Sequence, residues 1–265
     1  MGGALLGSLL VALPEAARAD FDAGWAAYQR GDFATALAEW QALAEQGNLL
    51  AEYNLGVLYD EGRGVTVDRA KAAEWWRKAA DQGHAGAQHN LALLELGSFA
   101  AQPDYHAAVA WLERASAKGF ARSLYSLGKL YAEGLGVAKD EARAFRLIHR
   151  AGQAGFANAQ YNMGKMLRDG SGTAPDPVAA LRWFRLAAEQ GYAKAQDKLG
   201  ARYAEGTEGL MADPVQALAW TILAARQGHP AAIGREAGLR ERMTAEQVAS
   251  AEHQAAGFSP VVSGR

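Results

Sequence analysis

Apolar residues recur along most of the chain at the three- and four-residue spacing of an amphipathic helix. One such segment is AEYNLGVLY at residues 51–59, and a second, rich in alanine and centred on Trp75 and Trp76, occupies residues 69–82. Segments of these two kinds alternate, and no stretch of any length shows the two-residue alternation of a strand. The pattern predicts an all-α chain made of helix pairs.

The helix pairs repeat with a period of 36 residues. The tetrapeptide YNLG at 53–56 returns as YNMG at 161–164, three periods later. A glycine recurs at the same interval, with a last step of 37 residues, and an aspartate stands fifteen residues before each glycine. A fixed period of this length is typical of repeat architectures, in which each unit packs on its neighbours. The markers are Asp32, Asp68, Asp104, Asp140, Asp176 and Asp213, followed by Gly47, Gly83, Gly119, Gly155, Gly191 and Gly228.

The two markers predict where the second helix of each pair begins and ends. An aspartate at the N-cap accepts from the free N–H groups of the first turn, and a glycine just past the helix adopts the left-handed conformation without a Cβ penalty. Pro177 and Pro214 directly follow two of the aspartates, at the first helical position where proline is tolerated. These residues are therefore expected to have a structural role.

A small residue recurs inside the first helix of each pair. A glycine in a helix costs about 1 kcal/mol relative to alanine, and close packing of large side chains can exceed that loss. We therefore expect a neighbouring helix to approach closely at these positions. They are Gly56, Ala92, Gly128, Gly164 and Gly200.

These residues resemble the Sel-one-like repeat family, a relative of the tetratricopeptide repeat. The family unit runs A-x-Y-N-L-G-x-L-Y-x-x-G-x-G-V-x-x-D-x-x-K-A-x-x-W-x-x-K-A-A-x-Q-G, and residues 51–83 match it almost throughout. The resemblance implies a right-handed α-solenoid of stacked helix pairs that acts mainly as a protein-binding scaffold, in bacteria often exported. The second unit departs from the pattern with LGSF at 96–99, and the fifth departs with Asp197 and Arg202, so local differences are expected there.

The repeats divide the chain into four parts. We expect a tetratricopeptide-like helix pair at residues 20–48, five Sel-one-like repeats at 49–229, and capping helices with a tail at 230–265. Residues 1–19 are expected to be a signal peptide, because a short apolar run is followed by an A-x-A pattern ending at Ala19. No basic residue precedes that run, so an N-terminal tail is the alternative. The expected mature chain is exported to the periplasm and has no membrane span.

Composition excludes several classes of function. Lys and Arg number 27 against 29 for Asp and Glu, and no basic run occurs, so nucleic-acid binding is not expected. The six histidines include no metal-binding spacing, cysteine is absent, and the glycine loops lack the strand and pattern of a nucleotide site. No metal and no cofactor are expected.

Catalytic signals are also weak. Ser126 and Lys129 spell the S-x-x-K of penicillin-binding enzymes, but the S-D-N and K-T-G partners are missing from the chain. The repeated aspartates are explained as N-caps. We therefore assign no catalytic residue. A cell-envelope hydrolase or β-lactam-binding protein on the same fold stays open as an alternative, and so does a structural assembly subunit.

One helix face in the middle of the chain is a candidate binding surface. Side chains three and four residues apart share a helix face, and two lysines from consecutive units are brought near one another there, whereas the other units carry no lysine at that position. This face is a candidate seat for an acidic peptide or a C-terminal carboxylate of a protein partner, bound by a monomer. The alternative is solvated lysines beside asparagines that bond backbone between repeats. The candidate residues are Tyr125, Ser126, Lys129, Tyr161, Asn162 and Lys165.

Overall fold

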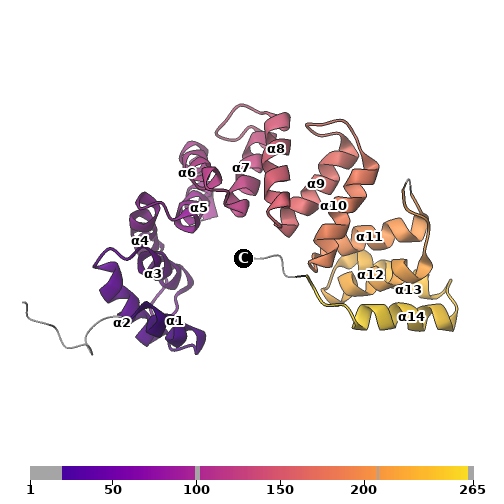
Figure 1. Ribbon diagram of the computed structural model, residues 1–265, viewed down its shortest axis with the longest axis horizontal. Helices are drawn as coiled ribbons and strands as arrows, with labels where there is room; N and C mark the ends of the chain where they lie inside the picture. The colour runs from indigo at the N-terminus through magenta and orange to yellow at the C-terminus, as the bar shows by residue number, and fades with distance from the viewer. Residues whose placement is uncertain (1–19, 99–101, 208, 262–265) are drawn as a thin grey trace, which may run out of the picture. The chain divides into compact units, whose positions relative to one another are not determined.

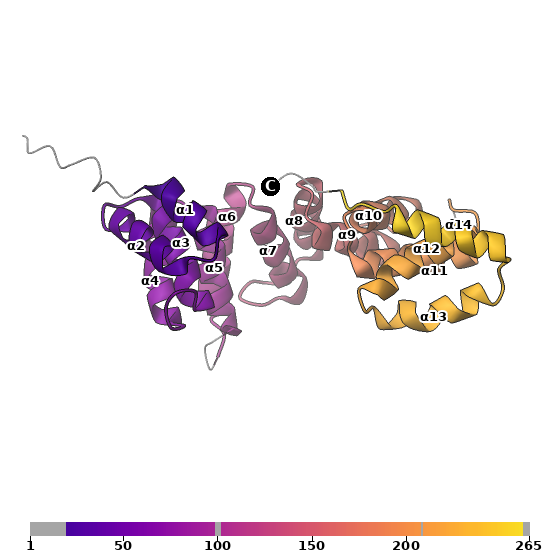
Figure 2. The ribbon, with the colours of Figure 1, turned by 90° about the horizontal axis from the view of Figure 1, so that it is seen from below.

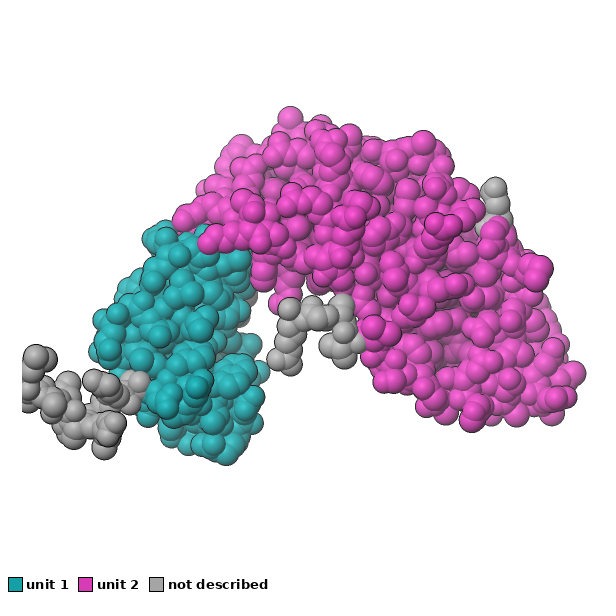
Figure 3. Space-filling model, viewed as in Figure 1, with its two compact units in different colours: residues 1–91 teal, residues 92–265 magenta. Residues whose placement is uncertain are grey.

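The computed structural model describes residues 20–98, 102–207 and 209–261. The signal peptide expected at residues 1–19 lies outside the described residues. The chain divides into two compact units, residues 1–91 and 92–265, which Figure 3 colours separately. The boundary between them falls within a single helix, α5 (Ala85–Leu93).

The described residues are almost entirely helical, which confirms the all-α prediction (Figure 1). An isolated bridge between Thr207 and Leu210 is the one extended pairing among them. The first unit contains α1 (Phe21–Gln29), α2 (Phe33–Ala44), α3 (Leu49–Glu61), α4 (Arg69–Asp81) and the larger part of α5. The second contains η2 (Leu94–Ser98), α6 (Tyr105–Ala117), α7 (Ala121–Glu133), α8 (Glu141–Gln153), α9 (Ala157–Asp169), α10 (Pro177–Glu189), α11 (Ala193–Glu205), α12 (Pro214–Arg226), α13 (Pro230–Arg240) and α14 (Ala245–Ala256).

The helices of the second unit stack as pairs in sequence order. Helix α7 packs on α8, α9 on α10 and α11 on α12, while contacts of α8 with α9 and of α10 with α11 join one pair to the next. A continuous core follows this stack from Ala92 to Leu199, and its buried residues are mainly alanine, leucine and methionine, with Val109, Ile148, Tyr131 and Phe184. Burial of these side chains is the main source of stability, since neighbouring pairs cover each other's apolar faces.

The repeated aspartates lie at N-caps and the repeated glycines follow helix ends. The Asp68 carboxylate accepts from the Lys71 N–H at 2.9 Å, and the Asp176 carboxylate accepts from the Ala179 N–H at 2.8 Å. Asp32, Asp104, Asp140 and Asp213 accept in the same way. All six glycines have a positive φ, between 78° and 95°. Both signals thus act locally to set the bounds of α2, α4, α6, α8, α10 and α12.

The small residues of the first helices lie against the second helix of the same pair. A Cβ added to Gly164 would lie 2.6 Å from Cε1 of Phe184, and one added to Gly128 would lie 2.7 Å from Cγ1 of Ile148. Both distances are shorter than van der Waals contact, so no larger residue fits without movement. The two helices of a pair therefore approach as closely as the sequence predicted.

The second repeat ends its first helix differently from the others. There the π-helical turn η2 replaces the glycine loop, with Gly97 at φ 86°, and the Asp104 N–H donates to the Glu95 carbonyl at 2.8 Å. The local reshaping expected at LGSF is observed up to Ser98.

The chain after the repeats forms two helices and a tail that packs on the stack (Figure 2). Helix α12 contacts both α13 and α14, and Thr244 with Gln247 forms the two bonds of a capping box. The Val261 N–H donates to the Glu189 carbonyl at the end of α10 at 2.8 Å. None of the described helices is both long and apolar enough to cross a membrane.

Candidate functional site

The two candidate tyrosines of the second unit pack against aromatic rings at the junction with the following repeat. The Tyr125 ring lies 5.4 Å from that of Phe156, and the Tyr161 ring lies 5.3 Å from that of Tyr192, measured between centroids. In both pairs the partner is the N-cap residue of the next repeat's first helix. Burial raises the pKa of Tyr125 and of Tyr161, so both hydroxyls stay protonated at neutral pH.

Asn162 connects the two repeats through its side chain. Its Nδ2 donates to the Tyr125 hydroxyl at 2.9 Å and to the Asn158 carbonyl at 2.8 Å. The hydrogen bond from Asn162 to the neighbouring repeat therefore ends on a side chain, that of Tyr125. The alternative given in the sequence analysis expected it to end on a backbone group. Since both amide donors are used, the position of Asn162 is set by its neighbours.

Lys129, Asn162 and Lys165 line one pocket of about 340 Å³ between α7, α8 and α9, which we call the central groove. Ile148 and Met166 contribute apolar surface to it. The structure thus brings together three of the six residues predicted from sequence. Tyr125, Ser126 and Tyr161 are outside its lining. Tyr125 contacts the groove indirectly, because its hydroxyl accepts the hydrogen bond from Asn162.

The charges of the central groove are unequally paired. Two of its carboxylates are engaged by cations outside the lining: Lys139 lies 2.6 Å from Glu141, and Arg168 makes two bonds of 2.6 and 2.8 Å to Asp169. The bond from Arg168 is the main reason that the pKa of Asp169 is lowered, and Lys165 adds to the effect. Glu133 is the third lining carboxylate.

The two lysines of the groove have no such partner. Within the described ranges neither Lys129 nor Lys165 forms a hydrogen bond or an ion pair that would hold its ammonium group. Their charges are available to an incoming group. Ser126 has no hydrogen bond to Lys129 or to a histidine in the described part of the chain, so this geometry offers no activated nucleophile.

Comparison with known families decides what kind of chain this is. A family model described as Sel1 repeat matches residues 49–84, 85–120, 121–156, 157–192 and 193–229. The chain belongs to the Sel1 repeat family. Sel1 repeat proteins are in general non-catalytic scaffolds that mediate protein interactions. The match confirms the predicted resemblance and the five repeats.

Solved structures agree with this assignment. A Sel1 repeat protein from Oxalobacter formigenes is 29% identical, with a TM-score of 0.73, over 87% of this chain and 93% of that one. A protective antigen of uropathogenic Escherichia coli with an SLR fold is 26% identical, with a TM-score of 0.57, over 89% and 60%. An immunity protein of Pseudomonas aeruginosa, 18% identical over 79% and 83% with a TM-score of 0.54, shares the fold. No curated protein matches this chain.

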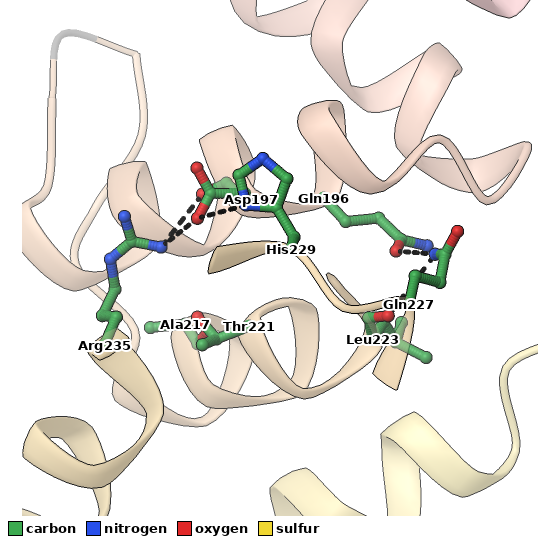
Figure 4. Close-up of polar contacts among 8 residues, drawn as sticks. All are labelled: Gln196, Asp197, Ala217, Thr221, Leu223, Gln227, His229 and Arg235. Carbon is green, nitrogen blue, oxygen red and sulfur yellow. Dashed lines mark hydrogen bonds and ion pairs between the residues drawn. The ribbon is translucent and has the colours of Figure 1, made fainter. Parts of the chain in front are cut away.

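A ladder of glutamines joins successive Sel1 repeats and was not predicted from sequence. The Gln196 amide donates to the Ala188 carbonyl of the preceding repeat at 3.2 Å, and Gln227 donates to the Gly191 carbonyl of that repeat at 3.0 Å. Within the last repeat, Gln227 also donates to the Gln196 side chain at 2.8 Å (Figure 4). Gln190 and Gln160 are paired in the same way at 2.7 Å.

The sequence did contain a signal for this ladder. Glutamine or glutamate recurs three residues before the leucine or methionine of the first helix, and a second glutamine stands before the marker glycine in the first, fourth and fifth repeats, whereas the second repeat has Lys118 there. The third repeat lacks both, with Leu124 and Ala154 instead. The first-helix members are Glu52, Gln88, Gln160 and Gln196, and the second-helix members are Gln82, Gln190 and Gln227.

The last Sel1 repeat replaces the aromatic pair with charges. Asp197 stands where Tyr161 stands in the fourth repeat, and it is 4% exposed. Its carboxylate lies 2.5 Å from Nη1 of Arg235 in α13 and 3.7 Å from Nδ1 of His229 (Figure 4). A buried carboxylate requires such partners. The departure at Asp197 thus serves to attach α13, and Arg235 was missed because it lies outside the repeat pattern.

Proposed function

We propose that this Sel1 repeat chain is a binding scaffold without catalytic activity, and that it holds an extended segment of a partner protein in the central groove. The observation that carries the proposal is the pair of lysines, Lys129 and Lys165, that line one groove from adjacent repeats with no partner among the described residues. The charged lining side chains left without a hydrogen bond or ion pair by the described residues are these two lysines and Glu133, so the unengaged charge is positive by one, and a positive site favours a ligand of opposite charge. The partner is therefore acidic at this site.

The remaining lining suits a peptide. Asn162 lines the groove and uses both of its amide hydrogens within the protein, so its oxygen is left as an acceptor for a backbone N–H of the partner. Ile148 and Met166 offer apolar surface for a side chain between the charged contacts.

The test is in-cell crosslinking of the tagged protein followed by mass spectrometry. We expect wild type to capture a discrete partner and Lys129→Glu/Lys165→Glu to lose it. Arg182→Glu/Lys194→Glu changes the charge equally at two exposed positions outside the groove and serves as the matched control. Capture by the control but not by the groove variant supports the proposal.

Two results would contradict the proposal. A partner retained by the groove variant would place binding elsewhere on the repeats. The absence of any partner in all three samples would argue against a binding scaffold and would justify assays for a hydrolase.

We also propose that the chain is exported to the periplasm and acts there as a monomer. Export is supported by the apolar run at residues 4–13 and by the A-x-A pattern that ends at Ala19. The monomer is supported by the exposed large apolar residues of the described chain, which are dispersed over different elements and include Trp25, Leu186 and Ile233.

A further inference from the structure

Arg202 occupies a position that is apolar in the other Sel1 repeats. The residues at the same place are Leu58, Leu94, Leu130 and Met166. Leu58, Leu130 and Met166 are buried, with exposures of 0%, 5% and 9%, and Leu94 in the reshaped second repeat is partly buried. Arg202 is itself partly buried. A guanidinium group at a core position loses hydration, and this costs free energy unless another group binds it.

Arg202 lines a small pocket together with Arg168. The pocket has a volume of about 50 Å³ and lies between α9, α10 and α11, with Pro177, Leu181 and Phe184 as its apolar wall. Arg168 is bonded to Asp169, whereas Arg202 forms no side-chain hydrogen bond or ion pair among the residues that the structure describes. One cation at this junction is thus left without a partner.

The pocket is the counterpart of the central groove one repeat further along. Arg168, Phe184 and Arg202 stand 36 residues after Ala132, Ile148 and Met166, which line the groove. The larger side chains explain why this pocket is much smaller. The two cavities lie on either side of α9, which contributes Lys165 to one and Arg168 to the other.

Several departures from the repeat pattern meet at this pocket. Arg168 stands where the third and fifth repeats have Ala132 and Ala204, and Arg202 stands where the fourth has Met166. Thr207, in the loop that carries the extra residue of the fifth repeat, completes the lining. Departures that would otherwise weaken a regular repeat indicate a functional site.

We propose that the pocket of Arg168 and Arg202 binds a carboxylate of the peptide that occupies the central groove, and this inference rests on the proposed function. The fork of an arginine guanidinium matches the two oxygens of a carboxylate. The volume of about 50 Å³ exceeds the roughly 10–15 Å³ that one water molecule needs, so the pocket has room for a carboxylate group. The carboxylate comes either from the C-terminus of the peptide or from an acidic side chain.

The test uses peptides selected on the purified full-length protein from a library with free C-termini. Each selected peptide is then measured by fluorescence anisotropy in three forms: the free acid, the C-terminal amide, and the free acid with Asp and Glu replaced by Asn and Gln. We expect one of the two neutralised forms to bind wild type about 10- to 100-fold more weakly, as for loss of a charge-assisted hydrogen bond. Which form weakens identifies the source of the carboxylate.

Arg202→Met is the decisive variant, because methionine stands at this position in the fourth repeat and is compatible with the fold. We expect the Arg202→Met protein to bind the charged and the neutralised peptide with equal affinity. That affinity should match the weak binding of the neutralised peptide to wild type. The melting temperature of the variant should stay the same or rise by about 2–4 °C, since an unpaired cation is removed. Arg182→Met, at an exposed position of α10, is the control and should change neither quantity.

The outcomes separate this inference from the proposed function. If Arg202→Met binds the charged peptide as tightly as wild type while Lys129→Glu/Lys165→Glu does not, the carboxylate pocket is wrong and the groove stands. A lower melting temperature with unchanged affinity would show that Arg202 is structural. If wild type selects no peptide, both proposals fail.

Discussion

At the scale of single residues, most of the residues that recur every 36 positions do so for a local physical reason. An aspartate at the N-cap and a glycine with positive φ act on their own turn of backbone, so the same residue can serve every repeat. The glycines inside the first helices are different. Their requirement comes from a side chain of the partner helix, for example the Phe184 ring that lies over Gly164.

Gly164→Ala should therefore destabilise the chain although alanine favours helix. The new Cβ meets the rigid ring of Phe184, and overpacking of this kind costs about 1–3 kcal/mol, against a gain in helix propensity of about 1 kcal/mol. Gly238→Ala is the matched control, because nothing lies within 4 Å of a Cβ there, and it should stabilise by up to about 1 kcal/mol. Urea unfolding of both variants measures the difference. Equal stability of the two would refute the close approach.

At the scale of elements, the junction between repeats depends on the glutamine ladder as well as on apolar burial. In the first repeat the ladder position is Glu52, which is buried and accepts from Gln82 at 2.7 Å. Burial raises the pKa of Glu52, and the hydrogen bond from Gln82 opposes that effect. The folded chain therefore holds this proton to higher pH than the unfolded chain does.

Glu52→Gln should make the free energy of unfolding less dependent on pH. With a raised pKa in the folded state, Glu52 contributes stability that is fully present below its unfolded pKa of about 4.3 and lost as the pH rises through the folded value. A glutamine, as at Gln160, carries no charge and keeps an acceptor for Gln82. We expect the variant to be more stable than wild type at pH 7, by up to about 1 kcal/mol, with no advantage at pH 4. Glu133→Gln, outside the ladder, is the control, and a gain that persists at pH 4 would contradict the explanation.

At the scale of the whole molecule, five Sel1 repeats present a series of junctions that differ mainly in their lining residues. The junction of α7 and α9 holds an open groove with lysines, and the junction of α9 and α11 holds a small pocket with arginines. In a repeat protein each junction is nearly independent, so function can be placed at one of them without altering the rest.

We expect the chain to be exported, to be cleaved after Ala19 and to be a monomer that begins at Asp20. The monomer is expected because the large exposed apolar residues of the described chain are dispersed over different elements. Light scattering and N-terminal sequencing of protein recovered from the periplasmic fraction should show one species lighter than the 28.1 kDa of the full chain. A stable oligomer would favour a structural assembly subunit, and an intact N-terminus would refute cleavage.

The sequence by itself determined the helix pairs, their period of 36 residues, the caps and the family. These features are readable because their causes lie within a few residues of the chain and recur five times. It also predicted that Lys129 and Lys165 lie near one another, since side chains at one position of consecutive repeats are neighbours, and the structure places both in the lining of the central groove.

Only the tertiary structure decided what surrounds those residues. It showed that Lys139 and Arg168 engage two of the groove carboxylates, that Asn162 is bonded to Tyr125, and that Arg235 pairs with Asp197. Each contact joins residues whose approach depends on how helices of different pairs or the terminal helices pack. Helix bounds and the repeat period can be predicted from the sequence because they depend on residues close together in the chain. The partner of a charged side chain cannot, because it depends on how the helices pack in three dimensions.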